Sequence, residues 1–360
     1  MIRTYKFRIY PSKSQKEKLE RTLGTCRHLY NTALEQRKTA YKRCQVSLNY
    51  YDQAKELKDL ELKHIHSQVL QDVLKRADRS FQNFFRRIKQ GEEKPGYPRY
   101  KSYNRYNSFT YPQSGFSLDK NKIKLSKIGN IKAKLHRQIQ GTIKTCTITR
   151  EINNWYVCFS CEVEHTPLPK TNKTIGVDMG LEKFVSLSNG EHISNPRYLR
   201  QSETELKHEQ RKLSRKKKGS NSRQKQREIV AKLHKKIYNQ RNDFLHKESR
   251  KLVNAYDLIV FEDLKIKNMV KNTRLSKSIS DASWGRFIEL TTYKAESAGR
   301  EVRFVNPKST SQKCSSCGQI VKKSLSARVH RCTCGLTLDR DTNAAINILR
   351  LGTNPGGATA

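Results

Sequence analysis

The first half of the chain changes between strand-like and helix-like spacing of its apolar residues. Apolar and polar residues alternate over 1–10, which predicts a strand that ends at Pro11 and Ser12. Ser14 followed by Glu17 fits a capping box, so we expect a helix to begin there. A second helix is expected over about 65–90 and should end at the Gly91–Pro98 segment. The apolar stripes of the two helices are Leu19, Leu23, Cys26, Tyr30 and Ala33, and then Ile65, Val69, Val73, Ala77, Phe81, Phe84 or Phe85, and Ile88.

Further strands follow this helical part. Residues 142–150 and 155–163 flank a polar turn and predict a β-hairpin. Together with the first strand, they favour a small β-barrel into which a helical bundle, 11–95, is inserted. The segment 166–174 holds two prolines and is typical of a linker.

The second half predicts strands and helices in a fixed order. Its elements are a strand over 174–180, a hairpin of 184–188 and 191–194, helices over about 203–218 and 222–254, a strand over 258–261, a helix over about 284–298, a strand over 302–305 and a helix over 341–351. The second helix carries an apolar stripe made of Ile229, Leu233, Ile237, Phe244 and Leu252. The helix pair is therefore expected to be an amphipathic hairpin whose stripe packs on the sheet.

These elements predict a mixed fold, partly α+β and partly α/β, with two domains. The first, 1–170, is the β-barrel domain with the helical insertion 11–95. The second, 171–350, is expected to be RNase H-like, with the basic helical hairpin 203–254 and a cysteine-rich insertion at 308–338. Residues 351–360 are expected to form a flexible tail.

The net charge of the chain indicates the class of molecule that it binds. The 360 residues include 73 Lys or Arg against 33 Asp or Glu, a formal net charge of +40. Such a charge favours binding to a polyanion, and nucleic acid is the leading candidate. No apolar run approaches the roughly 18 residues that span a bilayer, so no membrane partner is expected. The first ten residues lack the apolar stretch of a signal peptide, which favours a cytoplasmic, nucleoid-associated protein.

Several basic and aromatic residues are candidates for the nucleic-acid interface. Tyrosines and a phenylalanine recur every third residue from Tyr97 to Phe109, with cations between them. Such rings stack on bases or pack onto their own domain, and the sequence does not decide between the two. The basic helix faces could be merely solvated surface, but the net charge favours contact with nucleic acid. The residues expected to contact nucleic acid are Arg76, Arg79, Arg86, Arg87, Tyr100, Lys101, Arg215, Lys216, Lys217, Lys218 and Arg223.

Three carboxylates lie where a lone charge would be costly. Asp178 is inside an apolar strand, Glu262 directly follows the strand LIVF, and Asp341 lies at the start of a helix. Burial of an unpaired carboxylate is expensive, and a bound metal ion offsets that cost. Two Mg²⁺ ions about 3.5–4 Å apart stabilise both the attacking and the leaving oxygen of a phosphodiester. Taken singly, Asp178 could cap a turn, Glu262 could pair with a lysine, and Asp341 could be a helix N-cap.

Four cysteines predict a second metal site. Cys314 and Cys317 form one knuckle, Cys332 and Cys334 form another, and fourteen residues separate them. Four thiolates suit tetrahedral Zn²⁺, with no open position for catalysis. We expect one structural zinc ion in a zinc ribbon. Cys26, Cys44, Cys146, Cys158 and Cys161 lack such a pattern and are expected to behave as small apolar residues.

The acidic motifs resemble a known family. GVDMGL at 176–181, FEDL at 261–264 and DRDTNAAINI at 339–348 are similar to the three RuvC motifs of the TnpB family, also called OrfB. YKFRIYPSKSQKEKL, LKRADRSFQNFFRR and NPKSTSQKCSSCG resemble it too, so the resemblance covers nearly the whole chain. It implies an RNA-guided DNA endonuclease associated with insertion sequences and similar to type V CRISPR effectors. Its catalytic acids would be Asp178, Glu262 and Asp341, with Asp339 as an alternative to the third.

Three functions are weighed. The first is an RNA-guided, Mg²⁺-dependent endonuclease that cuts double-stranded DNA beside a short flanking motif, the guide RNA being implied by the resemblance alone. The second is a transposase that uses the same acids for strand transfer, because RNase H-like folds support both chemistries. The third is a zinc-ribbon regulator that binds nucleic acid without catalysis.

Overall fold

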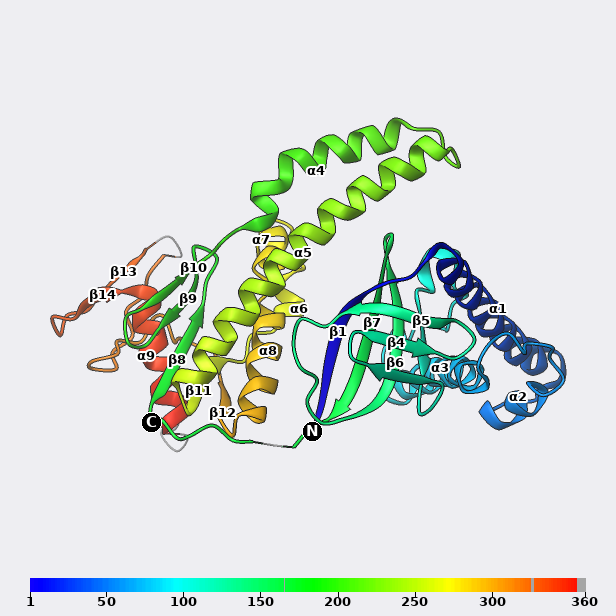
Figure 1. Ribbon diagram of the computed structural model, residues 1–360. Helices are drawn as coiled ribbons and strands as arrows, with labels where there is room; N and C mark the ends of the chain where they lie inside the picture. Colours follow the sequence, from blue (N-terminus) through cyan, green and yellow to red (C-terminus); the bar gives the residue numbers. More distant parts are fainter. Residues whose placement is uncertain (165, 325–326, 355–360) are drawn as a thin grey trace. The chain divides into compact units, whose positions relative to one another are not determined.

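The chain forms two compact units, Met1–Glu164 and His165–Ala360, in the computed structural model (Figure 1). The structure describes residues 1–164, 166–324 and 327–354. The predicted flexible tail lies largely outside these ranges, since only 351–354 of it are described. Among the described residues, no helix has the length and apolar character needed to cross a bilayer.

A seven-stranded sheet organises the first unit. Its strands are β1 (Ile2–Tyr10), β2 (Ser108–Tyr111), β3 (Phe116–Asp119), β4 (Lys122–Leu125), β5 (Gly129–Lys134), β6 (Thr142–Glu151) and β7 (Asn154–Glu162). All neighbours pair antiparallel in the order β2-β6-β7-β1-β5-β4-β3. The predicted hairpin of β6 and β7 is confirmed. The hydrogen-bonded order is open, with β2 and β3 at its ends, where the sequence predicted a barrel.

Three helices join β1 to β2. They are α1 (Lys13–Cys44), α2 (Tyr50–Glu56) and α3 (Ser67–Lys89), and a short 3₁₀ turn, Tyr103–Arg105, follows them. The start of α1 differs from the expectation. Ser12 is the N-cap, and it exchanges hydrogen bonds with Gln15 in a capping box. The pair Ser14 and Glu17 has the right spacing, but Ser12 comes first after Pro11, and its hydroxyl already accepts from the free backbone N–H of Gln15.

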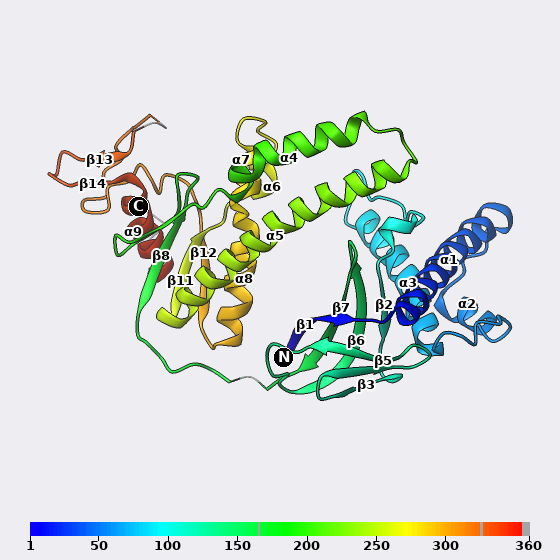
Figure 2. The same cartoon turned by 45° about the horizontal axis from the view of Figure 1, so that its top comes forward.

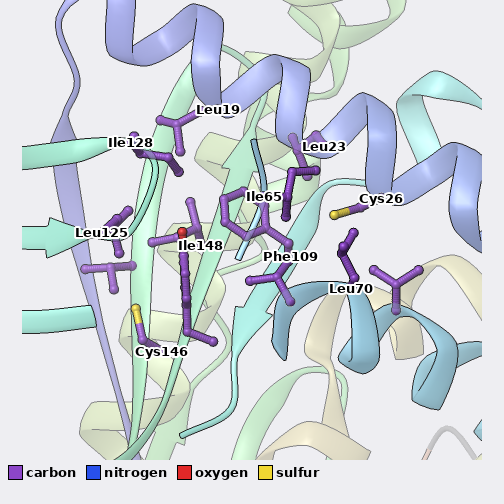
Figure 3. Packing of buried hydrophobic residues seen from close by; sticks show 14 of the residues in the cluster. Leu19, Leu23, Cys26, Ile65, Leu70, Phe109, Leu125, Ile128, Cys146 and Ile148 are labelled. Carbon is purple, nitrogen blue, oxygen red and sulfur yellow. The ribbon is translucent and has the colours of Figure 1, made fainter. Parts of the chain in front are cut away.

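The core of the first unit lies between these helices and the sheet. Leu19, Leu23 and Cys26 of α1 face Phe109 of β2 and Ile148 of β6 (Figure 3). The apolar stripe of α1 is buried as predicted, and that of α3 is buried as far as Phe81. Beyond it, Phe85 is 61% exposed and Ile88 is 48% exposed. The last turn of α3 therefore extends past the core that the stripe fills, and this part of the prediction is wrong.

A five-stranded sheet organises the second unit. Its strands are β8 (Thr174–Met179), β9 (Lys183–Leu187), β10 (His192–Ser194), β11 (Leu258–Glu262) and β12 (Glu301–Val305). The order is β10-β9-β8-β11-β12, in which the first three strands are antiparallel and β8, β11 and β12 run parallel. A separate two-stranded ribbon pairs β13 (Val329–Arg331) with β14 (Thr337–Asp339).

Helices cover both faces of this sheet, as Figures 1 and 2 show. The helices of the second unit are α4 (Tyr198–Arg215), α5 (Asn221–Ala255), α6 (Ile266–Met269), α7 (Ser276–Ala282), α8 (Trp284–Ser297) and α9 (Arg340–Thr353). Ile259 and Phe261 of β11 pack with residues of α5 and α8. Leu258 and Val260 pack with Ile348 of α9. Burial on both faces explains why β11 is apolar at consecutive positions.

The helical hairpin of α4 and α5 has its own small core. Leu206, Val230 and Ile237 form a separate buried cluster, and only the later part of α5, from Phe244, packs with the core of the sheet. The predicted stripe was therefore wrong in two respects. Ile229 is 43% exposed while Val230 beside it is buried. The outer half of α5 packs on α4, not on the sheet.

Of the cysteines outside the two knuckles, Cys26, Cys146 and Cys161 are buried, as expected of small apolar residues. Cys44 is exposed, because it is the last residue of α1 and lies beyond the core. Cys158 is half-buried.

Gly176 of β8 allows α9 to approach the sheet. A Cβ atom there would lie 2.1 Å from the carbonyl oxygen of Ala345 and 2.7 Å from the backbone nitrogen of Leu349. Backbone cannot move aside as a flexible side chain can. We expect Gly176→Ala to destabilise the second unit by about 3 kcal/mol, at the upper end of overpacking effects.

Calorimetry of thermal unfolding measures this effect. Gly24→Ala in α1 is the matched control, because a Cβ atom there meets nothing within 4 Å. It should raise stability by about 0.5–1 kcal/mol, as is usual for glycine within a helix. Equal effects of the two substitutions would contradict the close packing of α9 on β8.

Candidate active site and metal centre

The two strand carboxylates lie on the same face of the second sheet. Side chains alternate between the faces of a strand. In β8, Ile175, Val177 and Met179 belong to the core formed with α5 and α8, so Asp178 lies on the opposite face. In β11, Glu262 shares the face of Val260, which packs against α9. The strands are parallel neighbours, with Val177 opposite Phe261, so both acids come to the α9 side near the carboxyl ends of their strands.

The third carboxylate comes from the first turn of α9. Asp339 is the N-cap of this helix, and its Oδ1 accepts hydrogen bonds from the backbone N–H groups of Asp341 and Thr342, both at 3.1 Å. Its other oxygen pairs with Lys183 at 3.0 Å. Asp341 is therefore not the N-cap. Its carboxylate pairs with Arg340 at 3.2 Å.

Electrostatics show that the acids are close to one another. Burial, followed by the charges of Glu262 and Asp341, raises the pKa of Asp178 from 3.8 to about 8. Burial also raises the pKa of Glu262, although a hydrogen bond from Thr310 opposes this effect. Buried like charges of this kind are stabilised by a cation. Oxygen ligands from carboxylates are those that Mg²⁺ prefers, so the donor set fits that ion.

The four cysteines form a tighter group. All four sulfur atoms lie within 4.8 Å of one another, with 3.7 Å between Cys314 and Cys334 and 3.5 Å between Cys317 and Cys332. Among the residues that the structure describes, this is the one group of three or more His, Cys, Asp or Glu side chains placed to hold a metal ion. The three acids interact electrostatically but are not gathered around an ion position in the same way.

The chemistry of Cys314 suits a metal ligand. Burial raises the pKa of its thiol, but hydrogen bonds from the backbone N–H groups of Cys317 and Ser316 and from neighbouring side chains together lower the pKa to about 5. A thiolate is the form that binds zinc. The glycines after the two knuckles, Gly318 and Gly335, have φ angles of 82° and 92°, the left-handed turn that glycine favours.

Sequence reasoning missed His330 beside this group. It is fully buried, and its Nδ1 contacts the Lys323 amine at 2.5 Å. The His330 imidazole is another of the groups that lower the pKa of Cys314. No regular spacing relates it to the knuckles, so only the folded ribbon reveals it.

Polar residues around the acids were also missed. Thr310 donates a hydrogen bond to Glu262, and Asn343 and Asn347 of α9 bond to the backbone of the loop that leads into the first knuckle. Asn343 and Asn347 are four residues apart on a helix that is otherwise apolar on its buried side. Two buried amides in that position are the one signal in the sequence that could have indicated this contact.

The candidate nucleic-acid residues of the first unit divide into two kinds. Arg76 donates to Asp72, to the Ser108 carbonyl and to Thr110, and Arg87 holds the carbonyls of Pro95 and Gly96. These two guanidinium groups are used within the unit, which the helical pattern could not reveal. Arg79 and Arg86 lie on the outer side of α3 and are not buried.

The aromatic residues that recur from Tyr97 to Phe109 also divide into exposed and buried ones. Tyr97, Tyr100 and Tyr103 are 45–56% exposed, whereas Tyr106 and Phe109 are buried in the core. Tyr100 donates a hydrogen bond to Glu35, and the backbone N–H of Lys101 donates to Asn31. Packing onto the domain, one of the two alternatives left open by the sequence, is therefore confirmed for Tyr106 and Phe109, and stacking of the exposed rings on bases stays a prediction.

In the hairpin, Arg215, Lys217 and Lys218 are exposed at the end of α4 and in the turn after it. Lys216 is half-buried and donates to Ser222 at 2.8 Å. Arg223 is half-buried at the start of α5, and its backbone N–H bonds to the N-cap Ser220.

Comparison with known proteins identifies the family. The chain is 36% identical to the "Putative RNA-guided DNA endonuclease" of Streptomyces pristinaespiralis, over 97% of this chain and 89% of that protein. It is 33% identical to "Putative RNA-guided DNA endonuclease InsQ" of Escherichia coli (strain K12), over 98% of this chain and 92% of that protein. A family model described as "OrfB_IS605: Probable transposase" matches residues 158–273. The chain belongs to the TnpB/OrfB family.

Two further family models match the ends of this TnpB/OrfB chain. "Cas12f1-like, TNB domain" matches residues 284–348, and "Helix-turn-helix domain" matches 1–45, which here form β1 and the single helix α1. The solved "Structure of the mini-RNA-guided endonuclease CRISPR-Cas_phi3" shares the fold at a TM-score of 0.52 and 12% identity, over 98% of this chain and 92% of that one. The resemblance seen in the sequence motifs is thus confirmed at the level of family, and the mixed α and β architecture is confirmed with it.

The raised pKa of Asp178 predicts how stability depends on pH. The folded chain keeps a proton on Asp178 up to about pH 8, whereas the unfolded chain loses it near the ordinary pKa of 3.8. Stability without added magnesium should therefore fall as pH rises through this window, by at most about 1.4 kcal/mol per pH unit, and level off above pH 8.

Asp178→Asn removes this titration. We expect the variant to become more stable than the wild type by an amount that grows from pH 5 to pH 8, measured by thermal unfolding of the zinc-loaded chain. Asp119→Asn, at an exposed position in the first unit, is the control and should give no such trend. A constant difference between Asp178→Asn and the wild type would contradict the burial of this carboxylate among other acids.

Loss of the cysteines should remove a metal ion. We expect Cys314→Ser combined with Cys317→Ser to lower the metal content of the purified chain by one zinc ion and to destabilise the second unit. Structural zinc supplies ~10–16 kcal/mol of apparent binding free energy in small zinc-finger peptides. We therefore expect the loss of stability to extend beyond the zinc ribbon.

Elemental analysis and thermal unfolding test this expectation. Cys44→Ser is the matched control because Cys44 is exposed and lies in the other unit. A wild-type chain with less than one zinc ion, when purified without chelator, would contradict the site.

Proposed function

We propose that this chain is an RNA-guided DNA endonuclease that cleaves DNA beside a short flanking motif with the acids Asp178, Glu262 and Asp341. The relatives' names support guidance by RNA and action on DNA. The observation that carries the proposed chemistry is that Asp178 and Glu262 lie on the α9 side of the sheet, with Asp341 in the first turn of α9, and that burial and then the charges of Glu262 and Asp341 raise the pKa of Asp178. The second sheet has the order β10-β9-β8-β11-β12, with β10, β9 and β8 antiparallel and β8, β11 and β12 parallel, and this order is consistent with an RNase H-like, RuvC-type domain.

The residues would act in the following roles. Bound Mg²⁺ ions, two in this proposal, would activate the attacking water and stabilise the leaving oxygen. Asp178 and Glu262 would hold them from the rigid strands, and Asp341 from the first turn of α9. Asp339 is already used as the helix cap and as the partner of Lys183, which supports Asp341 as the third acid. The four knuckle cysteines would hold one structural Zn²⁺.

The two domains would have different roles in binding and cleavage. We infer that the part over 1–170, with its helical insertion 11–95, grips the flanking motif and the guide–target duplex. The nuclease part, 171–350, would hold the basic hairpin 203–254 and the zinc ribbon 308–338. In such systems base pairing reads the target sequence and the protein reads the flanking motif. Arg79 and Arg86 of α3, Tyr100, and Arg215, Lys217 and Lys218 of the hairpin remain the proposed contacts to nucleic acid.

A transposase is the second candidate, because the matching family model is described by that word. Strand transfer would use the same three acids but needs no guide. Sequencing of the RNA that copurifies with the chain, followed by cleavage assays with an exchanged guide, separates the two. Cutting that follows the exchanged guide supports the endonuclease, and strand joining without RNA supports the transposase.

Removal of a metal-holding acid should abolish cleavage without loss of binding. We expect Asp178→Ala, Glu262→Ala and Asp341→Ala to show no detectable cleavage of target DNA in Mg²⁺. Affinity for RNA and DNA should stay nearly unchanged, because it comes from many lysine and arginine contacts to phosphates. The matched control is Asp339→Ala, which should lose about 1 kcal/mol of helix-cap stability but keep cleavage. Full cleavage by any of the first three variants would refute the assignment.

The exposed cations of the hairpin should contribute salt-dependent affinity. We expect the change of Arg215, Lys217 and Lys218 together to Gln to reduce the slope of log K against log salt by about two to three units if all three contact phosphates of duplex. The control is Lys120→Gln with Lys122→Gln and Lys124→Gln on β4 and its turn, which are exposed in the first unit. An unchanged slope in the hairpin variant would mean that this face is solvated surface.

A further inference from the structure

Thr310 lies against the carboxylate of Glu262 in a buried environment. Glu262 is 9% exposed and Thr310 is 5% exposed. The Thr310 Oγ1 lies 2.5 Å from Glu262 Oε1 and 3.2 Å from the carbonyl oxygen of Pro307. A hydroxyl has a single hydrogen to donate, and the shorter contact to the charged acceptor is the stronger one. The hydroxyl proton therefore points at Glu262.

The backbone around Thr310 is fixed by α9. The side-chain amide of Asn347 donates to the carbonyl oxygens of Thr310 and Lys313, at 2.9 and 2.7 Å. Asn343 donates to the Lys313 carbonyl at 2.8 Å and accepts from the Ser315 N–H at 2.9 Å. Both asparagines are buried, at 4% and 0% exposure. Every one of these bonds joins α9 to the segment 310–315.

This segment connects three parts of the proposed site. Its first residue contacts Glu262, its fifth is the zinc-knuckle residue Cys314, and it is bonded to α9 directly after Asp341. The Arg350 guanidinium, also on α9, donates a hydrogen bond to the Ser315 carbonyl at 2.8 Å. Without the Thr310 hydroxyl, Glu262 would still lie at the end of β11. Its carboxylate would lose the hydrogen bond that selects one orientation.

We propose that Thr310 is a positioning residue for Glu262: its hydroxyl, fixed by the bonds between α9 and residues 310–315, orients the Glu262 carboxylate for the active-site metal. The proposal rests on the proposed function, in which Glu262 holds that metal. Partners that orient a metal-holding carboxylate usually contribute 10- to 100-fold to metal affinity. Thr310 matches that role, since its hydroxyl bonds to Oε1, one of the two oxygens of the Glu262 carboxylate.

The test compares Thr310→Val, which keeps the shape and removes the hydroxyl, with Thr310→Ser, which keeps the hydroxyl. The probe is Mn²⁺, titrated by electron paramagnetic resonance into the full chain after removal of nucleic acid and loading with zinc. We expect Thr310→Val to bind Mn²⁺ about 10- to 100-fold more weakly than the wild type. Thr310→Ser should restore most of the affinity. Glu262→Gln sets the scale for complete loss, and Thr353→Val, at an exposed threonine at the end of α9, is the matched control.

Zinc content and thermal unfolding of each variant separate orientation from folding. The proposal requires Thr310→Val to keep its zinc ion and its unfolding temperature within a few degrees while Mn²⁺ affinity falls. Unchanged affinity in Thr310→Val overturns the proposal, and so does a loss of affinity that is accompanied by loss of zinc. If Glu262→Gln binds Mn²⁺ as tightly as the wild type, the proposed role of Glu262 itself fails, and the role of Thr310 fails with it.

Discussion

The close packing of α9 against β8 and β11 is the constraint on which the candidate active site depends. It requires glycine at two positions, because a Cβ atom at Gly176 would meet the backbone of α9, and one at Gly352 would lie 2.5 Å from Val260 of β11. At this short separation, the first turn of α9 reaches the same region as the carboxyl ends of the two strands. Asp341 thus joins two acids that are far from it in the sequence.

The same packing creates an electrostatic cost that a cation would relieve. Asp178 is held among other carboxylates, and its raised pKa measures how unfavourable its charge is without a counter-ion. Among the described residues, Arg340 pairs with Asp341 and Lys183 pairs with Asp339, and these two cations offset part of the negative charge of the acidic motifs. Other positive charge lies elsewhere, for instance at the exposed end of the α4–α5 hairpin, where it suits a polyanion. Repulsion among the acids and excess charge at the surface are consistent with one chemistry, metal-dependent hydrolysis of a nucleic acid.

Much of this arrangement could be predicted from the sequence. Alternation of apolar and polar residues predicted β1, helical spacing predicted the buried face of α1, and the consecutive apolar residues over 258–261 predicted the strand β11. Cysteine spacing predicted the knuckles, because ligand geometry restricts the distance between neighbouring ligands. The motifs around the three acids gave the family. These are local signals, and each reflects one short segment whose own pattern sets its structure.

The missed features depend on contacts between distant segments. Arg76 has the position of a surface cation on α3, and only the fold brings the carbonyl of Ser108 to it. Ile229 and Val230 are equally apolar neighbours, and the packing of α4 on α5 decides which of them is buried. Thr310 precedes the first knuckle without any marked spacing, and its role emerges only when β11 places Glu262 beside it. Periodicity identifies the buried side of an element, but it does not identify the partner on that side.

Anomalous diffraction from crystals of the full chain grown with Mn²⁺, recorded at the manganese and zinc absorption edges, tests the central claim most directly. The account predicts manganese signal bounded by Asp178, Glu262 and Asp341, with Asp339 still on the helix cap, and zinc signal only among Cys314, Cys317, Cys332 and Cys334. Manganese bound by Asp339 in place of Asp341, or no manganese on the α9 face of the sheet, would contradict it.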